Sequence, residues 1–311
     1  MRTRGLVRRY GAAVAVAGLD LDVLPGEIYG FLGPNGAGKS TCMRMLCTLL
    51  RPSAGQATVA GHDVVAHSHD VRLRIGVALQ EAALDDRQSG RELLWLQGRL
   101  YGLRRKEIRR RVDEVLDLVD IGPALDRRIG TYSGGMKRRL DLAAALVHSP
   151  EILFLDEPTT GLDPGSRTAV WTEVRRLNDE LAITIFLTTQ YLEEADALAD
   201  RVGILAGGRL VAEGTPAALK RSVDDDVIEL QVEGDDPGAL GQVRRLDGVR
   251  AASRDGATIL VRTSDASATL HPVAVAFARS GLRVVAMNAR SATLDDVFQS
   301  LTSTRVAAER R

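Results

Sequence analysis

Apolar runs and mixed segments alternate along the first 220 residues. Runs rich in β-branched residues, typical of buried strands, occupy positions 27–32, 151–157, 182–189 and 201–206, and Gly207-Gly208 turns the last one towards a further strand at 209–214. Segments with apolar residues at helical spacing occupy positions 39–50 and 167–180. This alternation predicts an α/β domain.

Strand signals fade between about 84 and 150, where the pattern becomes helical at 91–103 and 107–121. We interpret this stretch as an all-helical insertion between sheet strands. It contains the basic run LRRKEIRRR at 103–111, which Glu107 and nearby acidic residues partly balance. A solvated helix face is the favoured interpretation of that run, with a nucleic-acid patch or a surface for a membrane partner or lipid headgroups as alternatives.

A different texture begins near SVDDDV. Strand patterns at 227–234, 257–263 and 282–289, with a helix from about Ala266 to Ser280, predict a small α+β domain over residues 223–311. The preceding domain is then 1–222. The closing segment 304–311 is expected to be a frayed tail.

Composition narrows the class of protein. Lys+Arg and Asp+Glu number 41 each, and this zero net charge argues against bulk binding of nucleic acid. No stretch reaches the ~18 apolar residues of a membrane helix, and the amino terminus lacks an apolar signal core, so we expect a cytoplasmic chain. Cys42 and Cys47 are expected to be reduced core thiols, and His62, His67 and His69 to be surface side chains.

The segment FLGPNGAGKST follows a predicted strand and opens a predicted helix. It fits G-x-x-x-x-G-K-[ST], whose glycines let backbone N–H groups surround phosphate oxygens while the helix start adds its positive dipole end. Lys39 then reaches the β- and γ-phosphates, the Ser40 hydroxyl serves Mg²⁺, and Thr41 faces the α-phosphate side. The full loop comprises Gly33, Pro34, Asn35, Gly36, Ala37, Gly38, Lys39, Ser40 and Thr41.

A second site is expected where the strand ILFLDE ends in two adjacent carboxylates. Neighbouring strand residues point to opposite sides, so the two carboxylates take different roles. Asp156 is expected to hold Mg²⁺ through water, and Glu157 to polarise the attacking water as general base. A strand end held only by ion pairs is the alternative.

Phosphate loops serve kinases, GTPases, helicases and transporters alike, so a third motif has to discriminate. Ser133, Gly134 and Gly135, in TYSGGMKRRLDLAAAL, form a polar turn that opens another helix, 156 − 133 = 23 residues before Asp156. With these motifs in this order, residues 1 to about 220 resemble the ATP-binding cassette ATPases, the motor subunits of ABC transporters. The resemblance implies a mixed sheet core, an antiparallel β subdomain and a helical insertion.

The resemblance also assigns roles to individual positions. Two cassettes pair head to tail around two ATP molecules in this family, so Ser133 and Gly135 are expected to act in trans, and Asp163 to lie in the loop that crosses the interface. Tyr10 matches the aromatic residue that stacks on adenine. Gln80 matches the glutamine that senses Mg²⁺ and links the sheet to the helical insertion.

Two positions depart from the family pattern. Met136 replaces the usual fifth signature residue, glutamine, and Gln190 stands where the switch histidine normally faces the γ-phosphate. A glutamine amide donates and accepts hydrogen bonds at similar reach but does not titrate near neutral pH. We therefore expect retained hydrolysis with a weaker pH dependence, the alternative being a nucleotide-binding regulator without turnover.

The segments YSGGMKRRLDLA, LTTQYLEEADALAD and TLDDVFQSLT resemble the daunorubicin-resistance type of drug-exporter ATPase, in which the switch glutamine recurs. That resemblance implies a homodimer peripheral to the cytoplasmic face of the membrane, working with a separate multi-span permease. An ABC ATPase acting on ribosomes or DNA, or an uptake system, is the alternative. The C-terminal domain is expected to stabilise the dimer or to contact the permease.

Overall fold

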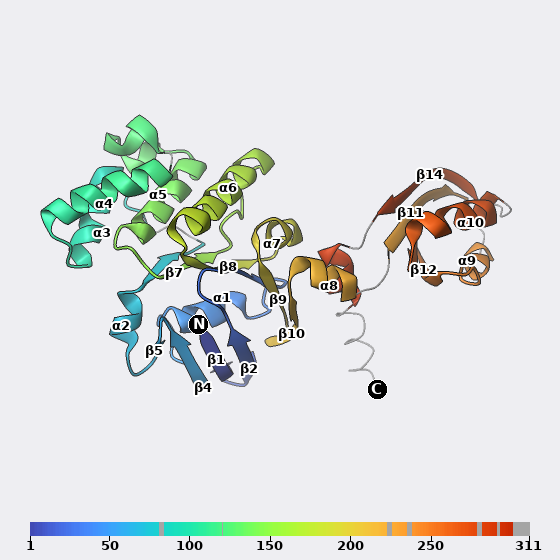
Figure 1. Cartoon of the computed structure of the whole chain (residues 1–311), viewed down its shortest axis with the longest axis horizontal. Coiled ribbons are helices and arrows are strands. Elements are labelled where there is room, and N and C mark those ends of the chain that lie inside the picture. The colour runs from blue at the N-terminus through green and yellow to red at the C-terminus, as the bar shows by residue number, and fades with distance from the viewer. Residues whose placement is uncertain are drawn as a thin grey trace. The chain divides into compact units, whose positions relative to one another are not determined.

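The structure, a computed structural model, describes residues 1–80, 84–119, 121–222, 226–234, 238–278, 282–290 and 293–300. The chain divides into two compact units, Met1–Pro216 and Ala217–Arg311. The predicted tail at 304–311 lies outside the described residues. Each unit is described by itself below (Figure 1).

The first unit is organised around a six-stranded sheet with the order β10-β9-β3-β8-β7-β6. Its neighbours run parallel except for β10, which forms an antiparallel hairpin with β9 through the predicted turn. The strands are β3 (Ile28–Leu32), β6 (Ile75–Ala78), β7 (Ile152–Asp156), β8 (Thr184–Thr189), β9 (Arg201–Ala206) and β10 (Arg209–Gly214). Every residue of β3, β7 and β8 is buried, which explains their continuous apolar runs.

A second, four-stranded antiparallel sheet has the order β2-β1-β4-β5. Its strands are β1 (Arg2–Tyr10), β2 (Ala13–Asp22), β4 (Ala54–Val59) and β5 (His62–Asp63). Helix α1 (Lys39–Leu46) contacts strands of both sheets, and its Met43 is fully buried in the apolar cluster that they share with Leu6 and Phe154. The phosphate-loop segment is therefore anchored between two sheets.

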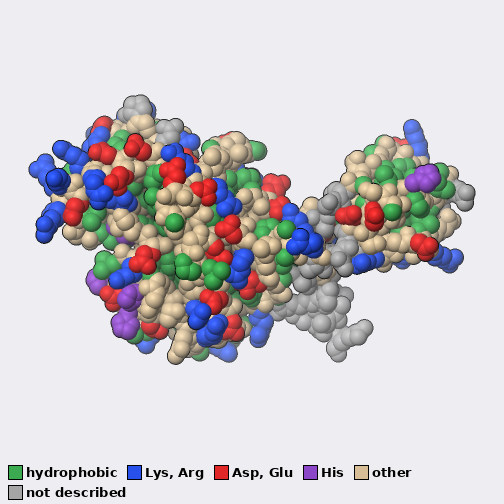
Figure 2. All heavy atoms as spheres, viewed as in Figure 1, with side chains coloured by type: hydrophobic (Ala, Val, Ile, Leu, Met, Phe, Trp, Pro, Cys, Tyr) green, Lys and Arg blue, Asp and Glu red, His purple; other side chains and the backbone are tan. Residues whose placement is uncertain are grey.

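Helices follow where the pattern predicts them. The insertion contains α3 (Gly90–Leu100), α4 (Arg105–Leu118), α5 (Gly134–Leu146) and the short 3₁₀ turns Gly122–Asp126 and Ile129–Thr131. Helix α3 begins with a capping box, in which the Ser89 hydroxyl accepts from the Glu92 amide and the Glu92 carboxylate accepts from the Ser89 amide. Figure 2 shows Lys and Arg side chains gathered on the surface of α3 and α4, so the basic run is a solvated face.

The remaining helices of the unit are α2 (Ser68–Arg72), α6 (Pro164–Leu181) and α7 (Leu192–Leu198). Helix α8 (Pro216–Ser222) begins at the last residue of this unit and otherwise belongs to the second. Several predicted boundaries are wrong; the helix predicted at 39–50, for example, ends at Leu46. The strand predicted from position 182 begins at Thr184, because Ala182 ends α6 in a left-handed conformation with φ of 50°. The apolar character of Leu181 and Ala182 belongs to the helix end.

The second unit has the element order β11 (Asp226–Glu233), α9 (Ala239–Val243), β12 (Val249–Asp255), β13 (Thr258–Thr263), α10 (Ala266–Ala278) and β14 (Arg283–Arg290). Its sheet order is β12-β13-β11-β14, a split βαβ arrangement with an α+β composition. Strand β12 and helix α9 have no counterpart in the sequence-based prediction. Only Ala252 of β12 is buried, so its alternating apolar signal is too weak to detect.

Both cysteines are free and buried, as predicted, and burial raises the pKa of the Cys42 thiol to about 12. Within the described ranges, no helix is both long enough and apolar enough to cross a membrane.

Candidate functional site

The loop between β3 and α1 contains two glycines, Gly33 and Gly38, at which any side chain would clash with neighbouring backbone. Gly38 has φ of 106°, and a Cβ built there would lie 2.3 Å from the Ala15 carbonyl oxygen. A Cβ at Gly33 would lie 2.5 Å from the Leu205 carbonyl oxygen. The backbone therefore approaches two neighbouring strands closely, and it leaves the open side of the loop and the first turn of α1 free for an anion.

Lys39 is buried at the start of α1, with 4% of its surface exposed. Its Nζ donates to the carbonyl oxygens of Gly33 at 2.8 Å and Pro34 at 3.2 Å. The same ammonium pairs with Glu157 Oε1 at 3.2 Å. The loop thus carries a buried positive charge whose partner is the expected general base.

The two carboxylates at the end of β7 diverge, as the strand alternation predicts. Asp156 Oδ1 accepts from the Ser40 hydroxyl at 3.1 Å and from the Thr188 hydroxyl at 2.5 Å. Glu157 adopts φ of 48°, an unusual conformation for a residue with a side chain, and its amide donates to the Thr188 carbonyl at 3.0 Å. This turn directs Glu157 towards Lys39, while Asp156 faces α1.

A pocket of about 460 Å³ opens beside the loop. Gln80 and Gln190 reach it from the carboxyl ends of β6 and β8, because parallel strands end at one edge of the sheet. The residues that line it are Ala15, Asn35, Gly36, Gly38, Lys39, Ser40, Thr41, Gln80, Glu157, Thr160 and Gln190.

Two lining residues escaped the sequence analysis. Ala15 has no functional group and lines the pocket only because β2 passes the loop. Thr160 donates its hydroxyl to Glu157 Oε2 at 3.2 Å, and its place three residues after the paired carboxylates is the signal that could have found it.

Other predicted residues lie outside this pocket. Tyr10 ends β1 with 48% of its surface exposed, and the Arg8 guanidinium lies 4.7 Å from its ring centre. Ser133 caps α5 by accepting from the Met136 amide at 3.2 Å, and Gly134 and Gly135 form the first turn of that helix. Asp163 caps α6 by accepting from the Ser166 amide at 3.0 Å.

The oxygen donors at the pocket fit a hard cation. The Ser40 hydroxyl and the Asp156 carboxylate are already in contact, and the Gln80 amide lines the same pocket. Mg²⁺ favours one or two protein oxygens together with water and substrate phosphates. The set is therefore suited to Mg²⁺ held jointly with a nucleotide.

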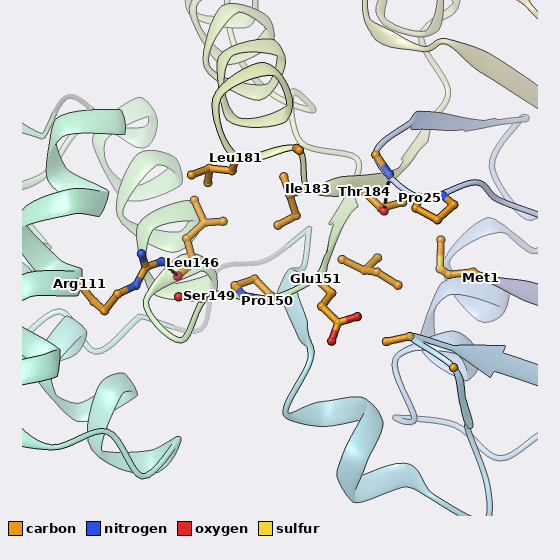
Figure 3. Close-up of a pocket in the computed structure, with 15 residues that line it drawn as sticks. Met1, Pro25, Arg111, Leu146, Ser149, Pro150, Glu151, Leu181, Ile183 and Thr184 are labelled. Atoms are coloured by element: carbon orange, nitrogen blue, oxygen red, sulfur yellow. Dashed lines mark hydrogen bonds between the residues drawn. The ribbon is translucent and has the colours of Figure 1, made fainter.

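A larger hollow of about 660 Å³ lies elsewhere in this unit (Figure 3). Arg111, Glu151, Ile183 and Thr184 line it, at the amino ends of β7 and β8. The glycine loop and the paired carboxylates lie at the carboxyl ends of these strands. The smaller pocket is therefore the candidate site.

The glycine-rich loop joins a strand to a helix, and Lys39 lies at the start of that helix. Ser40 contacts Asp156, and Glu157 lies at the same pocket. Together these features define a P-loop nucleoside-triphosphate-binding protein. The sequence profile of the ABC transporter family matches residues 16–160.

Full-length relatives agree with that match. The chain is 46% identical over 299 residues to the daunorubicin resistance ATP-binding protein DrrA3 of Streptomyces coeruleorubidus, covering 96% of this chain and 94% of the relative. It is 40% identical over 299 residues to the Nod factor export ATP-binding protein I of Rhizobium sp. strain N33, covering 96% and 95%. The chain belongs to the ABC transporter family as an ATP-binding subunit, and it is an ATPase.

Solved structures agree on the fold. An ATP-binding subunit of an ABC transporter superposes with a TM-score of 0.64 at 28% identity, covering 71% of this chain and 92% of that chain. A dimeric bacterial ABC transporter cassette superposes with a TM-score of 0.62 at 22% identity, covering 69% and 97%. The predicted P-loop cassette is confirmed.

Proposed function

We propose that this chain is the ATP-hydrolysing motor of an exporter that moves a drug or other hydrophobic metabolite through a separate multi-span permease. The proposal is supported by the names of the relatives, which are resistance and export ATP-binding proteins aligned over nearly the whole chain. It places the chain at the cytoplasmic face of the membrane as a peripheral subunit.

In this proposal the loop, Lys39 and the oxygen ligands at the pocket each have a separate role. Backbone amides of the loop bind the ATP phosphates, and Lys39 turns from its carbonyl partners towards the β- and γ-phosphates. Ser40, Asp156 and Gln80 hold Mg²⁺, in part through water. The bound ion neutralises phosphate charge, and the protein contributes position and electrostatic complementarity.

The convergence of Lys39, Glu157 and Gln190 on one pocket is the observation that carries the proposed hydrolysis. Glu157 accepts the proton of the attacking water once phosphate oxygens have taken its lysine partner. The Thr160 hydroxyl holds the other carboxylate oxygen, which limits rotation of the base. The Gln190 amide orients the water or the γ-phosphate without changing its own protonation state.

We propose further that two copies pair head to tail. Ser133 and Asp163 are exposed and Gly135 is half-buried, and none of the three lines the pocket of its own subunit. Both Ser133 and Asp163 lie at the start of a helix, where free backbone N–H groups favour an anion. In a head-to-tail dimer they face the ATP of the partner, and Tyr10 stacks on the adenine of its own subunit.

Glu157→Gln tests the motor directly. Removing a positioned general base lowers Mg-ATP turnover by ~10²–10⁴ while ATP binding is retained. Turnover is measured for wild type, Glu157→Gln, Gln190→Ala and, as a control, Glu180→Gln, whose carboxylate is exposed on α6. Co-expression with the permease keeps a strictly coupled motor from being missed.

Each outcome decides between two functions. A fast wild type with a dead Glu157→Gln and an impaired Gln190→Ala identifies a motor with a working glutamine switch. A wild type no faster than Glu157→Gln, even with its permease, identifies a nucleotide-binding regulator instead. A panel of drugs applied to cells that express both chains then identifies the cargo.

A further inference from the structure

Helix α5 places a buried arginine beside the segment that leads into Gln80. Arg138 is 7% exposed, and its Nη1 donates to the Leu79 carbonyl at 2.7 Å and to Asp141 Oδ2 at 3.3 Å. Its Nε and Nη2 are buried with no hydrogen-bond acceptor in the described part of the chain. A buried guanidinium satisfied through one nitrogen carries a desolvation cost that a further acceptor would remove.

Helix α7, which follows Gln190, places a buried carboxylate with the complementary deficiency. Glu194 is fully buried, and its Oε1 accepts from the Thr159 hydroxyl at 2.8 Å and from Trp171 Nε1 at 3.1 Å. Its Oε2 is buried without a hydrogen bond of good geometry, and the nearby Thr189 hydroxyl is the described donor that helps to lower the pKa of Glu194. Glu194 therefore connects the segment after Glu157 to helix α6 through Oε1, and its Oε2 remains able to accept a further hydrogen bond.

The two charges occupy one packed region. Leu140 of α5, Val174 of α6 and Leu198 of α7 belong to a single apolar cluster. Burial lowers the pKa of Arg138, an effect that the negative charges of Asp141 and then Glu194 oppose. Burial likewise raises the pKa of Glu194. Hydrogen bonds from Thr189, Thr159 and Trp171 oppose that rise, and the positive charge of Arg138 opposes it to a smaller extent. Yet no ion pair joins Arg138 and Glu194 across the described ranges.

We propose that Arg138 and Glu194 form a buried ion pair when the nucleotide pocket closes, and that both are positioning residues for hydrolysis. Gln80 directly follows Leu79, so a turn of Gln80 towards bound phosphates moves the carbonyl that now holds Arg138. The released guanidinium then meets Glu194 Oε2, which completes the hydrogen bonds of both groups.

The consequence is a mechanical link between the two halves of a composite site. Helix α5 presents Ser133 to a partner subunit, whereas Glu194 is connected to the segments that carry Glu157 and Gln190. An ion pair between Arg138 and Glu194 fixes the position of helix α5 relative to the segments that carry Glu157 and Gln190. This inference rests on the proposed function, because it requires ATP-driven closure.

A double-mutant cycle tests the pair. Arg138→Gln, Glu194→Gln and the double variant keep polar side chains of similar shape, and each is assayed for kcat and KM with Mg-ATP and for urea unfolding without nucleotide. Each single change is expected to lower kcat roughly tenfold with little change in KM, and the double variant to fall no further. Unfolding without nucleotide is expected to show a much weaker coupling than kcat does, since only the longer-range attraction between the two charges acts there.

Two controls separate positioning from a general structural role. Arg138→Lys keeps the charge and is expected to recover part of the lost kcat. The exposed Arg176–Glu180 pair of α6, taken through the same cycle, is expected to leave kcat unchanged. Losses that multiply in the Arg138/Glu194 double variant, or equal coupling in nucleotide-free unfolding, would overturn the proposal.

A structure of the Glu157→Gln protein bound to Mg-ATP gives a second, independent decision. Arg138 and Glu194 within ion-pair distance support the proposal, and separated side chains in a closed pocket reject it, even if a cycle variant does not fold. If the wild type hydrolyses no ATP, the proposed motor function is rejected. If the wild type is active but the effects of the two changes on kcat are additive, only the proposed ion pair is rejected.

Discussion

Gly36 and Gly38 share a backbone conformation closed to most residues, but their surroundings differ. Both have positive φ, 80° and 106°, whereas only a Cβ at Gly38 would meet another atom, the Ala15 carbonyl oxygen. We expect Gly38→Ala to weaken ATP binding by at least ~100-fold, which corresponds to about 2.8 kcal/mol. Gly36→Ala is expected to weaken ATP binding by only the ~1–2 kcal/mol of strain that a left-handed backbone conformation imposes on alanine. Titration with a fluorescent ATP analogue measures both, and equal losses would contradict a role for the Ala15 contact.

Gln190→His introduces a titrating group at the end of β8. Because an unperturbed imidazole has a pKa of about 6.5, hydrolysis by the variant is expected to vary with pH between ~6 and 8. The wild-type amide does not ionise, so its rate is expected to be flatter over that interval. Steady-state turnover of both proteins across this range checks the difference. A wild type as steep as the variant would show that another group controls the rate.

At the residue scale, motifs pointed to Lys39 and Asp156, and the family resemblance pointed to Gln190. The structure places Lys39 and Gln190 at one pocket and Asp156 against Ser40, while their roles stay predictions. The sequence could not predict Ala15, which matters through a backbone oxygen, or the proximity of Arg138 to Glu194. Those contacts depend on how distant segments pack, and neither local spacing nor periodicity encodes that packing.

At the scale of elements, His148 fastens the end of α5 to the sheet. Its ring stacks on Tyr101 at 3.6 Å between centres, and its Nε2 hydrogen-bonds the Ile75 carbonyl at 2.9 Å. Burial lowers the pKa of His148 to about 4 from the usual 6.5. The unfolded chain therefore binds this proton first, and stability present above pH 6.5 is lost as pH falls towards 4.

His148→Phe removes that proton-binding difference while keeping an aromatic ring against Tyr101. We expect the acid limb between pH 4 and 6.5 to flatten by up to about 3 kcal/mol of unfolding free energy. His69→Gln is the control, because His69 is exposed. Urea unfolding at several pH values provides the measurement, and an unchanged limb in His148→Phe would assign acid sensitivity to other groups.

Element type followed from the sequence more reliably than element boundaries did. Buried strands such as β7 and β8 appear as uninterrupted apolar runs, whereas β12 has little buried surface and was missed. The start of β8 was misplaced because Ala182, an apolar residue, ends a helix in a left-handed conformation. Capping geometry of that kind leaves no apolar pattern to detect.

At the scale of the molecule, all residues that line the pocket belong to the first unit. A chain ending at residue 222 is therefore expected to fold and to bind ATP within a few-fold of the full chain. If the second unit stabilises the dimer or contacts the permease, the truncated chain loses dimerisation or drug resistance. Sedimentation and a resistance assay distinguish these effects, and full retention of both would remove the proposed role.

The change of pattern near SVDDDV predicted two domains and the motif order predicted a cassette, but the sheet order β10-β9-β3-β8-β7-β6 needed the structure. Chain order alone leaves many arrangements of parallel strands open. In the observed order β6, β7 and β8 are parallel neighbours, so their carboxyl ends lie together beside the pocket.

The Lys39–Glu157 ion pair also restrains the expected general base. While the ammonium holds the carboxylate, the base cannot serve a water molecule, and releasing it requires an anion that competes for the same charge. A phosphate group that binds Lys39 therefore also frees Glu157. Nucleotide binding and activation of the base are therefore coupled through a single ammonium group, so neither can change without the other.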